Sequence, residues 1–135
     1  MGRPVLILLD THVVVWLASG DSHMSRAAQA AIDHSRKSER GLAVSDFTLF
    51  ELSQLFRKKQ FSLFVSPESF LAEVEKRFVV LPITSNIALQ AFELPASYPK
   101  DPADRIIGAT ALVEDLPLVT ADTQIRKCRA FPTIW

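Results

Sequence analysis

Cysteine is nearly absent from this chain, since Cys128 is the only one among its 135 residues. A single cysteine cannot form an intrachain disulfide, and it cannot supply the several thiolates of a typical structural zinc site. The simplest expectation is therefore a protein of a reducing, cytoplasmic compartment.

Glycine is also scarce, with residues only at positions 2, 20, 41 and 108. These four positions cannot compose the G-x-G-x-x-G fingerprint, which argues against a dinucleotide-binding Rossmann domain. Long apolar runs are missing as well, because near the N-terminus only residues 5–9 form a continuous apolar run before Asp10. That run is too short for a signal-peptide core or a membrane span, so we expect no membrane partner.

Neither sign of charge is in excess, because 15 lysines and arginines balance 15 aspartates and glutamates. No global positive field draws the chain toward nucleic acid or anionic lipid, so any polyanion must be held locally. Basic residues do cluster at 36–40, 57–59 and 126–129. The simplest interpretation of each cluster is a solvated helix face or helix end.

The chain has 48% hydrophobic residues, which is enough for one compact domain over residues 1–135. Short apolar segments alternate with helical patterns along it. This alternation predicts an α/β fold, a three-layer α/β/α sandwich with a central, mainly parallel sheet. The expected strands are 4–9, 41–45, 79–83, 116–121 and an edge strand within 131–135. The expected helices are 13–18, 25–36, a helix from 47, 66–78, 85–94, 102–114 and a short helix from 122.

Acidic residues follow two of the expected strands. Asp10 ends the first apolar run, and Asp122 comes just after the segment LVTA. In a parallel sheet with helices on both faces, ligands bind beyond the carboxyl ends of the strands, where the strand order reverses. Each acid taken alone is explained equally well as the N-cap of the next helix.

Three further acids are candidates for the same edge of the sheet. Glu51 has apolar neighbours at i−4, i−1 and i+4 of its expected helix, so it lies on or beside the packed face. Asp101 and Asp104, in the segment DPADR, fit the N-cap and the third position of a helix, where backbone amides and the macrodipole favour acids. Capping explains Asp101 fully, whereas Asp104 can point toward the sheet.

Four carboxylates brought to one edge repel one another, and no lysine or arginine is obviously placed among them. Either upward pKa shifts keep some of them protonated, or divalent cations neutralise them. Oxygen ligands without a cysteine or a histidine pair favour Mg²⁺ or Mn²⁺. The histidines lack ligand spacing, although His12 adjoins Asp10 and is placed to touch a substrate. The four acids are Asp10, Glu51, Asp104 and Asp122.

Four segments, taken in order and spacing, resemble a known family: LLDTHVVVWL (8–17), SDFTLFEL (45–52), DPADRIIGATAL (101–112) and LVTAD (118–122). They are similar to PIN-domain ribonucleases, specifically the VapC-type toxins of bacterial and archaeal toxin–antitoxin pairs. The resemblance spans nearly the whole chain. It implies a PIN-like fold and an endoribonuclease that depends on Mg²⁺ or Mn²⁺, with one or two ions bound.

The resemblance also implies which residues act. The catalytic and metal-binding set is Asp10, Glu51, Asp104 and Asp122, and Asp101, which belongs to the DPxDR variant of the family, has a supporting role.

Other residues are candidates for secondary roles around these acids. Thr11, Ser45 and Thr120 lie beside the acids in the sequence and are candidates to orient them through hydrogen bonds. Arg105, His12 and the basic clusters are candidates for contacts with RNA phosphates.

Partners follow from the resemblance as well: an RNA substrate, a VapB-like antitoxin and a second copy of the chain. The antitoxin would cover the acidic cleft with its C-terminal segment, often with a basic residue reaching into it. The phenylalanine-rich stretch is a candidate groove for dimer or antitoxin, and an ordinary core is an equally good interpretation. Its members are Phe47, Phe50, Phe56, Phe61 and Phe64.

Two alternatives stay open from the sequence. A receiver-like phosphoacceptor domain also uses an acidic Mg²⁺ pocket at strand ends, but it needs a phosphate-accepting Asp and a nearby lysine. A PIN-domain nuclease or RNA-binding protein outside a toxin–antitoxin pair is the second alternative.

Overall fold

A computed structural model describes residues 6–21, 23–38, 41–59 and 64–135. The strands are β1 (Ile7–Leu9), β2 (Leu42–Ser45), β3 (Val79–Leu81), β4 (Leu118–Val119) and β5 (Thr133–Ile134). The helices are α1 (Thr11–Ser19), α2 (Arg26–Lys37), α3 (Asp46–Arg57), α4 (Pro67–Arg77), α5 (Ser85–Glu93), α6 (Pro102–Glu114) and α7 (Thr123–Cys128). Residues 4–5 of the first expected strand, Arg40 and Phe61 lie outside the described residues.

The five strands form one sheet in the order β3-β2-β1-β4-β5, and every neighbouring pair is parallel. The chain adds β2 and β3 on one side of β1 and then returns to add β4 and β5 on the other side. The strand order therefore reverses at β1. In open parallel sheets this reversal opens a crevice at the carboxyl ends of the strands, here those of β1 and β4.

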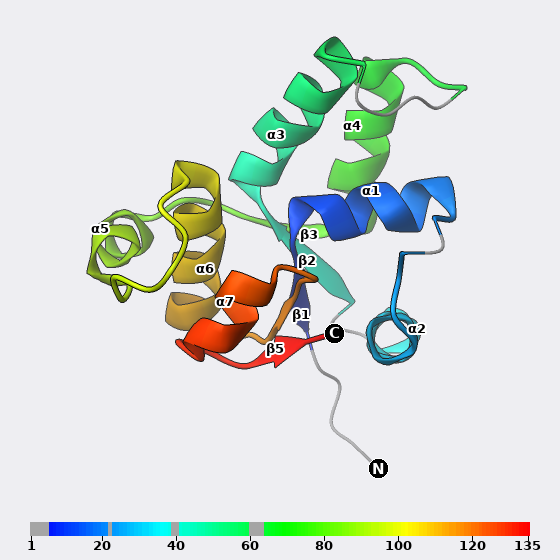
Figure 1. The fold of residues 1–135 in the computed structure, drawn as a ribbon. Coiled ribbons are helices and arrows are strands. Elements are labelled where there is room, and N and C mark those ends of the chain that lie inside the picture. The colour runs from blue at the N-terminus through cyan, green and yellow to red at the C-terminus, as the bar shows by residue number, and fades with distance from the viewer. Residues whose placement is uncertain (1–5, 22, 39–40, 60–63) are drawn as a thin grey trace.

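The sheet separates two hydrophobic cores, because alternate side chains of a strand point to opposite faces. On β1, Ile7 and Leu9 pack into the core beneath α1, α2, α3 and α4, whereas Leu8 packs into the core beneath α6 and α7. Figure 1 shows α1 and α2 on one side of the sheet and α5, α6 and α7 on the other. The predicted three-layer α/β/α fold is confirmed.

Caps account for most helix starts. Ser25, Ser66 and Thr84 each accept a hydrogen bond from the amide three residues later, and Pro67 follows Ser66 at the first helical position. At the C-terminus the expected edge strand forms as β5. Pro132 lies just before this strand, so its missing N–H interrupts none of the strand residues, and its carbonyl accepts the amide of Leu118 at 3.0 Å.

The phenylalanine-rich stretch is divided between core and surface. Phe56 of α3 packs edge-on against Phe70 of α4, with ring centroids 5.5 Å apart, and joins the first core. Phe50 and Phe64 are 55% and 111% exposed. Figure 1 shows α3 and α4 rising together beyond the end of the sheet. Among the described residues, none of the helices combines the length and the apolar character needed to cross a membrane.

Candidate active site

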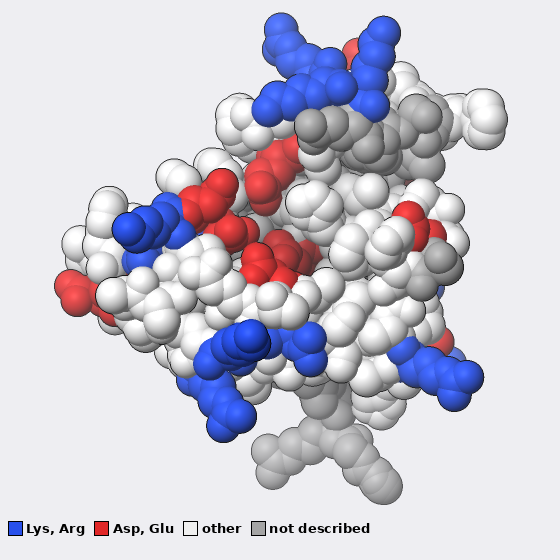
Figure 2. All heavy atoms as spheres, viewed as in Figure 1, with Lys and Arg blue, Asp and Glu red and all other residues white. Residues whose placement is uncertain are grey.

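A cavity of about 410 Å³ lies at the crevice where the strand order reverses. Apart from acidic residues, its described lining contains His12, Val13, Trp16 and Ala121, but neither a lysine nor an arginine. Figure 2 shows the acidic side chains gathered in this hollow of the molecular surface. The sequence had predicted four of its acids together, and the cavity contains all four as well as the supporting one. Its five carboxylates are Asp10, Glu51, Asp101, Asp104 and Asp122.

Asp10 is held by both of its carboxylate oxygens. Its Oδ1 accepts the amide of Thr11 at 2.9 Å, which caps α1, and its Oδ2 accepts the hydroxyl of Thr120 at 2.7 Å. Burial raises the pKa of this carboxyl, and the hydrogen bonds from Thr120 and Thr11 oppose the rise. The carboxylate therefore has a fixed orientation at the end of β1.

Glu51 ends a chain of hydroxyl groups that runs through the core side of α3. The Thr11 hydroxyl donates to Glu51 Oε1 at 2.5 Å and lies 3.0 Å from the Thr48 hydroxyl. Because each hydroxyl has one hydrogen and that of Thr11 is used on Glu51, Thr48 is the donor to Thr11. Thr48 is fully buried. It was missed in the sequence, where its position three residues before Glu51 on one helix was the available signal.

Asp104 lies in the first turn of α6, where negative charge accumulates. Asp101 caps this helix, its Oδ1 accepting the amides of Ala103 at 2.8 Å and of Asp104 at 3.4 Å. Burial first, and then the charges of Asp10, Asp101, Asp122 and Glu51, raise the pKa of Asp104 from 3.8 to about 7. Burial also raises the pKa of Glu51, with the charges of Asp10 and Asp101 adding to the effect.

Asp122 closes the site on the β4 side. Its Oδ1 accepts the amides of Gln124 and Ile125, at 2.9 and 3.0 Å, and so caps α7. The amide of Asp122 donates to the Thr120 hydroxyl at 3.1 Å, and that hydroxyl itself donates to Asp10. Thr120 thus connects the ends of β1 and β4 through one buried oxygen.

The remaining predicted residues have other contacts. The Ser45 hydroxyl caps α3 by accepting the amide of Phe47 at 3.1 Å, and within the described chain no hydrogen bond joins it to an acid of the cavity. His12 is exposed at the rim, with its ring 6.2 Å from that of Trp16. The Arg105 guanidinium donates to the Ala91 carbonyl at 3.0 Å and lies 6.0 Å over the Tyr98 ring. A contact of Arg105 or His12 with RNA stays a prediction.

The donor set fits a hard divalent cation. Five carboxylates share one cavity whose described lining contains no lysine or arginine, and burial, with the charges of the other four acids adding to it, raises the pKa of Asp104. Among the residues that the structure places, no three acids, histidines or cysteines converge into a ready-made ligand group. Mg²⁺ commonly binds through one or two carboxylates and keeps several waters. The residues therefore fit an ion whose coordination is completed by water.

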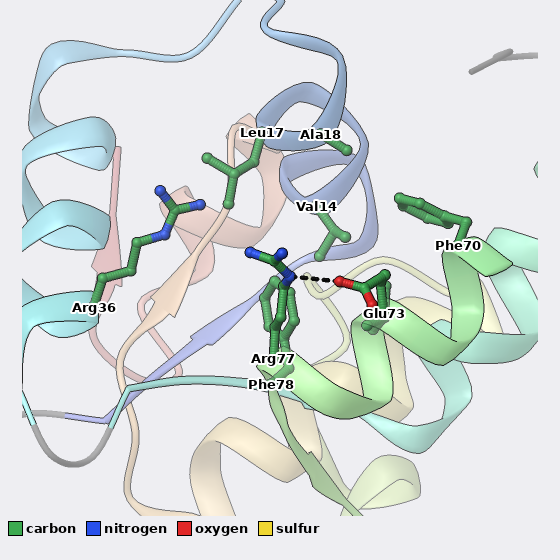
Figure 3. A pocket seen from close by; sticks show the side chains of 9 residues that line it. Val14, Leu17, Ala18, Arg36, Phe70, Glu73, Arg77 and Phe78 are labelled. Atoms are coloured by element: carbon green, nitrogen blue, oxygen red, sulfur yellow. Dashed lines mark hydrogen bonds and ion pairs between the residues drawn. The ribbon is translucent and has the colours of Figure 1, made fainter. Parts of the chain in front are cut away.

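A second cavity, of about 280 Å³, lies between α1, α2 and α4. Figure 3 shows Arg36 and Arg77 reaching toward it, with Val14, Leu17 and Phe70 among its apolar walls. Its one acid, Glu73, accepts a hydrogen bond from Arg77 Nε at 2.8 Å. This cavity has no group of acids, so it does not share the chemistry of the first one.

The comparisons with known proteins agree with this arrangement. Residues 7–130 match the family model of the PIN domain, and the chain belongs to that family. This membership rules out the receiver-like alternative. More particularly, the chain is 37% identical over 123 residues to Ribonuclease VapC22 of Mycobacterium tuberculosis, covering 91% of this chain and 92% of that protein.

Solved structures share the fold at lower identity. VapBC2 from Rickettsia felis, bound to a DNA fragment from its promoter, has a TM-score of 0.69 and 15% identity, covering 96% of this chain and 97% of that one. VapBC-1 from nontypeable Haemophilus influenzae has a TM-score of 0.69 and 18% identity, covering 96% of both chains. At these identities the likeness establishes the fold alone.

Proposed function

We propose that this chain is an endoribonuclease that requires Mg²⁺ or Mn²⁺, hydrolyses RNA phosphodiester bonds and acts as the toxin of a VapB–VapC pair. The observation that carries the proposal is the cavity at the ends of β1 and β4, with five carboxylates and no cationic neighbour in its described lining. The identity to a protein named a ribonuclease supports RNA as the substrate.

Within this proposal, Asp10, Glu51, Asp104 and Asp122 hold one or two ions, and Asp101 supports Asp104 by capping the same helix. A bound ion would stabilise the negative charge that develops on the phosphate and make a water molecule a better nucleophile. No serine or histidine nucleophile is needed for this chemistry: the described lining of the cavity contains no serine, and its one histidine, His12, is exposed at the rim.

The threonines then supply preorganisation. Thr120 and the Thr11 amide fix both oxygens of Asp10, and the Thr48–Thr11 pair fixes one oxygen of Glu51. Side chains held before the substrate arrives need no reorganisation during the reaction. The fixed oxygens also keep the acids apart, so their repulsion is not relieved by side-chain rotation. The site is thereby biased toward binding positive charge.

The proposed partners are a VapB-like antitoxin and a second copy of the chain, in a cytoplasmic setting. The similar solved structures support the antitoxin, since VapBC complexes are among them. A segment that closes a cavity of five carboxylates needs positive charge of its own. We therefore expect the antitoxin to place a lysine or arginine there.

Cleavage of total RNA with mapped ends tests the proposal. The wild-type protein is incubated with Mn²⁺ and then with excess EDTA, beside Asp10→Asn and Asp104→Asn. Cleavage should depend on the ion and stop with EDTA. Each variant should lose more activity than the 10- to 100-fold that is roughly typical of outer-shell changes.

Asp33→Asn is the matched control, because Asp33 is an exposed acid of α2 that accepts a hydrogen bond from Gln29 and does not line the acidic cavity. It should cleave at the wild-type rate. Wild-type protein that cuts no RNA with either ion would overturn the proposed function. An Asp104→Asn variant with wild-type rates would remove Asp104 from the mechanism.

A further inference from the structure

Beside the acidic cavity lies a smaller, basic one, of about 270 Å³. We call it the basic pocket, and it is lined by Thr123, Arg126, Lys127 and Arg129. All four residues belong to α7 or to its C-cap. Figure 2 shows blue side chains next to the red hollow, in the region that α7 occupies in Figure 1.

The three cations of the basic pocket have no acidic partner within the described chain. The ion pairs found there join His23 to Asp21 and Arg77 to Glu73. The helix macrodipole accounts for basic residues in the last turn of α7, but it does not require them to line a common cavity. Because the whole chain is formally neutral, this is a local concentration of positive charge.

The two cavities are adjacent along one short helix. The Asp122 carboxylate lines the acidic cavity, and the next residue, Thr123, lines the basic pocket. At a rise of roughly 1.5 Å per residue, Arg126 lies about 6 Å further along the axis. A polyanion whose reacting phosphate is at the acids would thus have its next phosphates close to three cations.

We propose that the basic pocket binds a backbone phosphate that flanks the bond to be cut, an inference that rests on the proposed RNA hydrolysis. Two guanidinium groups offer paired N–H donors, the lysine offers a point charge and the threonine offers a hydroxyl, all of which suit phosphate oxygens. Such contacts position a strand without reading its sequence. The pocket therefore sets which phosphate reaches the acids.

Binding of a fluorescent single-stranded RNA, followed by anisotropy in EDTA so that no cleavage occurs, tests this assignment. The variant Arg126→Gln/Lys127→Gln/Arg129→Gln should bind at least about tenfold more weakly at low salt. The slope of log affinity against log salt should fall by about 1. In cleavage assays with Mn²⁺, its KM should rise while kcat at saturation stays within about twofold, since these residues do not touch the reacting atoms.

The comparison variant is Arg57→Gln/Lys58→Gln/Lys59→Gln, which removes the same charge from another basic cluster that the sequence offered for phosphate contacts, at the exposed C-terminal end of α3. These three residues line neither the acidic cavity nor the basic pocket, so this variant should lose less affinity and less slope than the α7 variant. Equal losses in both triple variants, or none in either, would overturn the assignment even where the wild-type protein cleaves RNA. Failure of the wild type to cleave would instead count against the proposed function. Because Arg126 is half-buried, its replacement can weaken the fold as well as RNA binding. Melting curves and the single variants of the exposed residues, Lys127→Gln and Arg129→Gln, distinguish the two effects.

Discussion

At Asp104, burial and four neighbouring carboxylates act in the same direction and raise its pKa from 3.8 to about 7. The folded protein therefore binds this proton more tightly than the unfolded chain. The stabilisation that this gives is present below about pH 4 and is lost as the pH rises to about 7. This is the reverse of the usual salt-bridged aspartate.

We predict that, without divalent cations, the wild-type protein becomes less stable between pH 4 and pH 8, and that Asp104→Asn is less sensitive to pH and more stable at pH 8. Denaturant unfolding at several pH values measures this. Asp33→Asn should follow the wild-type curve. An Asp104→Asn curve parallel to the wild type would mean that Asp104 does not carry the effect.

The Thr48 hydroxyl gives a second prediction at this scale. Thr48→Val keeps the shape of the side chain but removes the hydrogen that Thr11 accepts, which loosens the orientation of Glu51. We expect roughly a 10- to 100-fold loss of RNA cleavage and weaker Mn²⁺ binding, with the fold retained. Thr48→Ser keeps the hydroxyl and should restore both. Equal activity of the valine and serine variants would show that the Thr48 hydroxyl does not orient Glu51 through Thr11.

The sequence indicated part of this residue-level arrangement. Thr11 and Thr120 were expected to bond to the acids because they are their close neighbours in the chain, and they do so in the structure. For Thr48 the sequence offers only its position three residues before Glu51 on the same helix. The partner of Thr48 is on another helix, 37 residues away, and no local pattern predicts that contact.

At the scale of elements, capping and lining the site prove to be compatible roles. From the sequence, capping a helix and lining a functional site were alternative explanations for Asp10 and Asp122. A carboxylate has two oxygens, and in Asp122 one of them accepts both capping bonds while the residue also lines the cavity. The sequence could not decide between the two roles because both require an acid at the same place.

Strand lengths were the weaker part of the sequence prediction. The fourth strand was expected at 116–121, but β4 covers only Leu118–Val119. Leu116 is buried in the second core although it lies outside the strand, so the apolar run is longer than the paired segment. The length of a strand depends on how far the neighbouring strand extends beside it. The apolar pattern of one segment does not give the length of that neighbour.

Gly108 lets α6 pack closely against the side chain of Tyr98. A Cβ there would lie 2.2 Å from the Tyr98 hydroxyl and 2.7 Å from its ring carbon, so the close contact is with the segment before α6. The same hydroxyl donates to the Asp104 carbonyl at 2.8 Å. Gly108 therefore helps to position the first turn of α6, which carries Asp104.

We predict that Gly108→Ala destabilises the protein by about 1–3 kcal/mol through overpacking. It should also lower RNA cleavage, because the displaced tyrosine can no longer hold the turn of Asp104. Denaturant unfolding and cleavage rates measure the two effects. Adding Tyr98→Phe removes the nearest atom of the clash, so the double variant should recover part of the stability relative to Gly108→Ala. No recovery would show that the contact with Tyr98 is not the cause.

At the scale of the whole molecule, the strand order is what brings the acids together. Asp10 and Asp122 are far apart in the chain but follow β1 and β4, which pair directly. The alternation of strands and helices predicted a parallel sheet, and it did not predict the order β3-β2-β1-β4-β5. The pattern of elements therefore predicted that the acids share the carboxyl edge of the sheet, but it did not predict that Asp10 and Asp122 follow neighbouring strands.

The metal binding proposed for this cavity would make the stability of the molecule depend on divalent cations. An ion that binds only the folded state adds about 2.7 kcal/mol at a concentration of a hundred times its Kd. We predict that Mn²⁺ or Mg²⁺ raises the melting temperature by several degrees at pH 8. Below about pH 7 the effect should shrink, because the proton on Asp104 then competes with the ion.

Screening by salt also relieves repulsion between carboxylates, so the same scan at matched ionic strength with NaCl is the necessary control. If Mn²⁺ binds in the site, it should raise the melting temperature more than NaCl does, and the increase should saturate with Mn²⁺ concentration. The increase should be lost in Asp104→Asn. Equal shifts with both salts would mean that the five acids are only screened. In that case the cavity would hold no specific ion, and the chemistry proposed for it would have no metal to depend on.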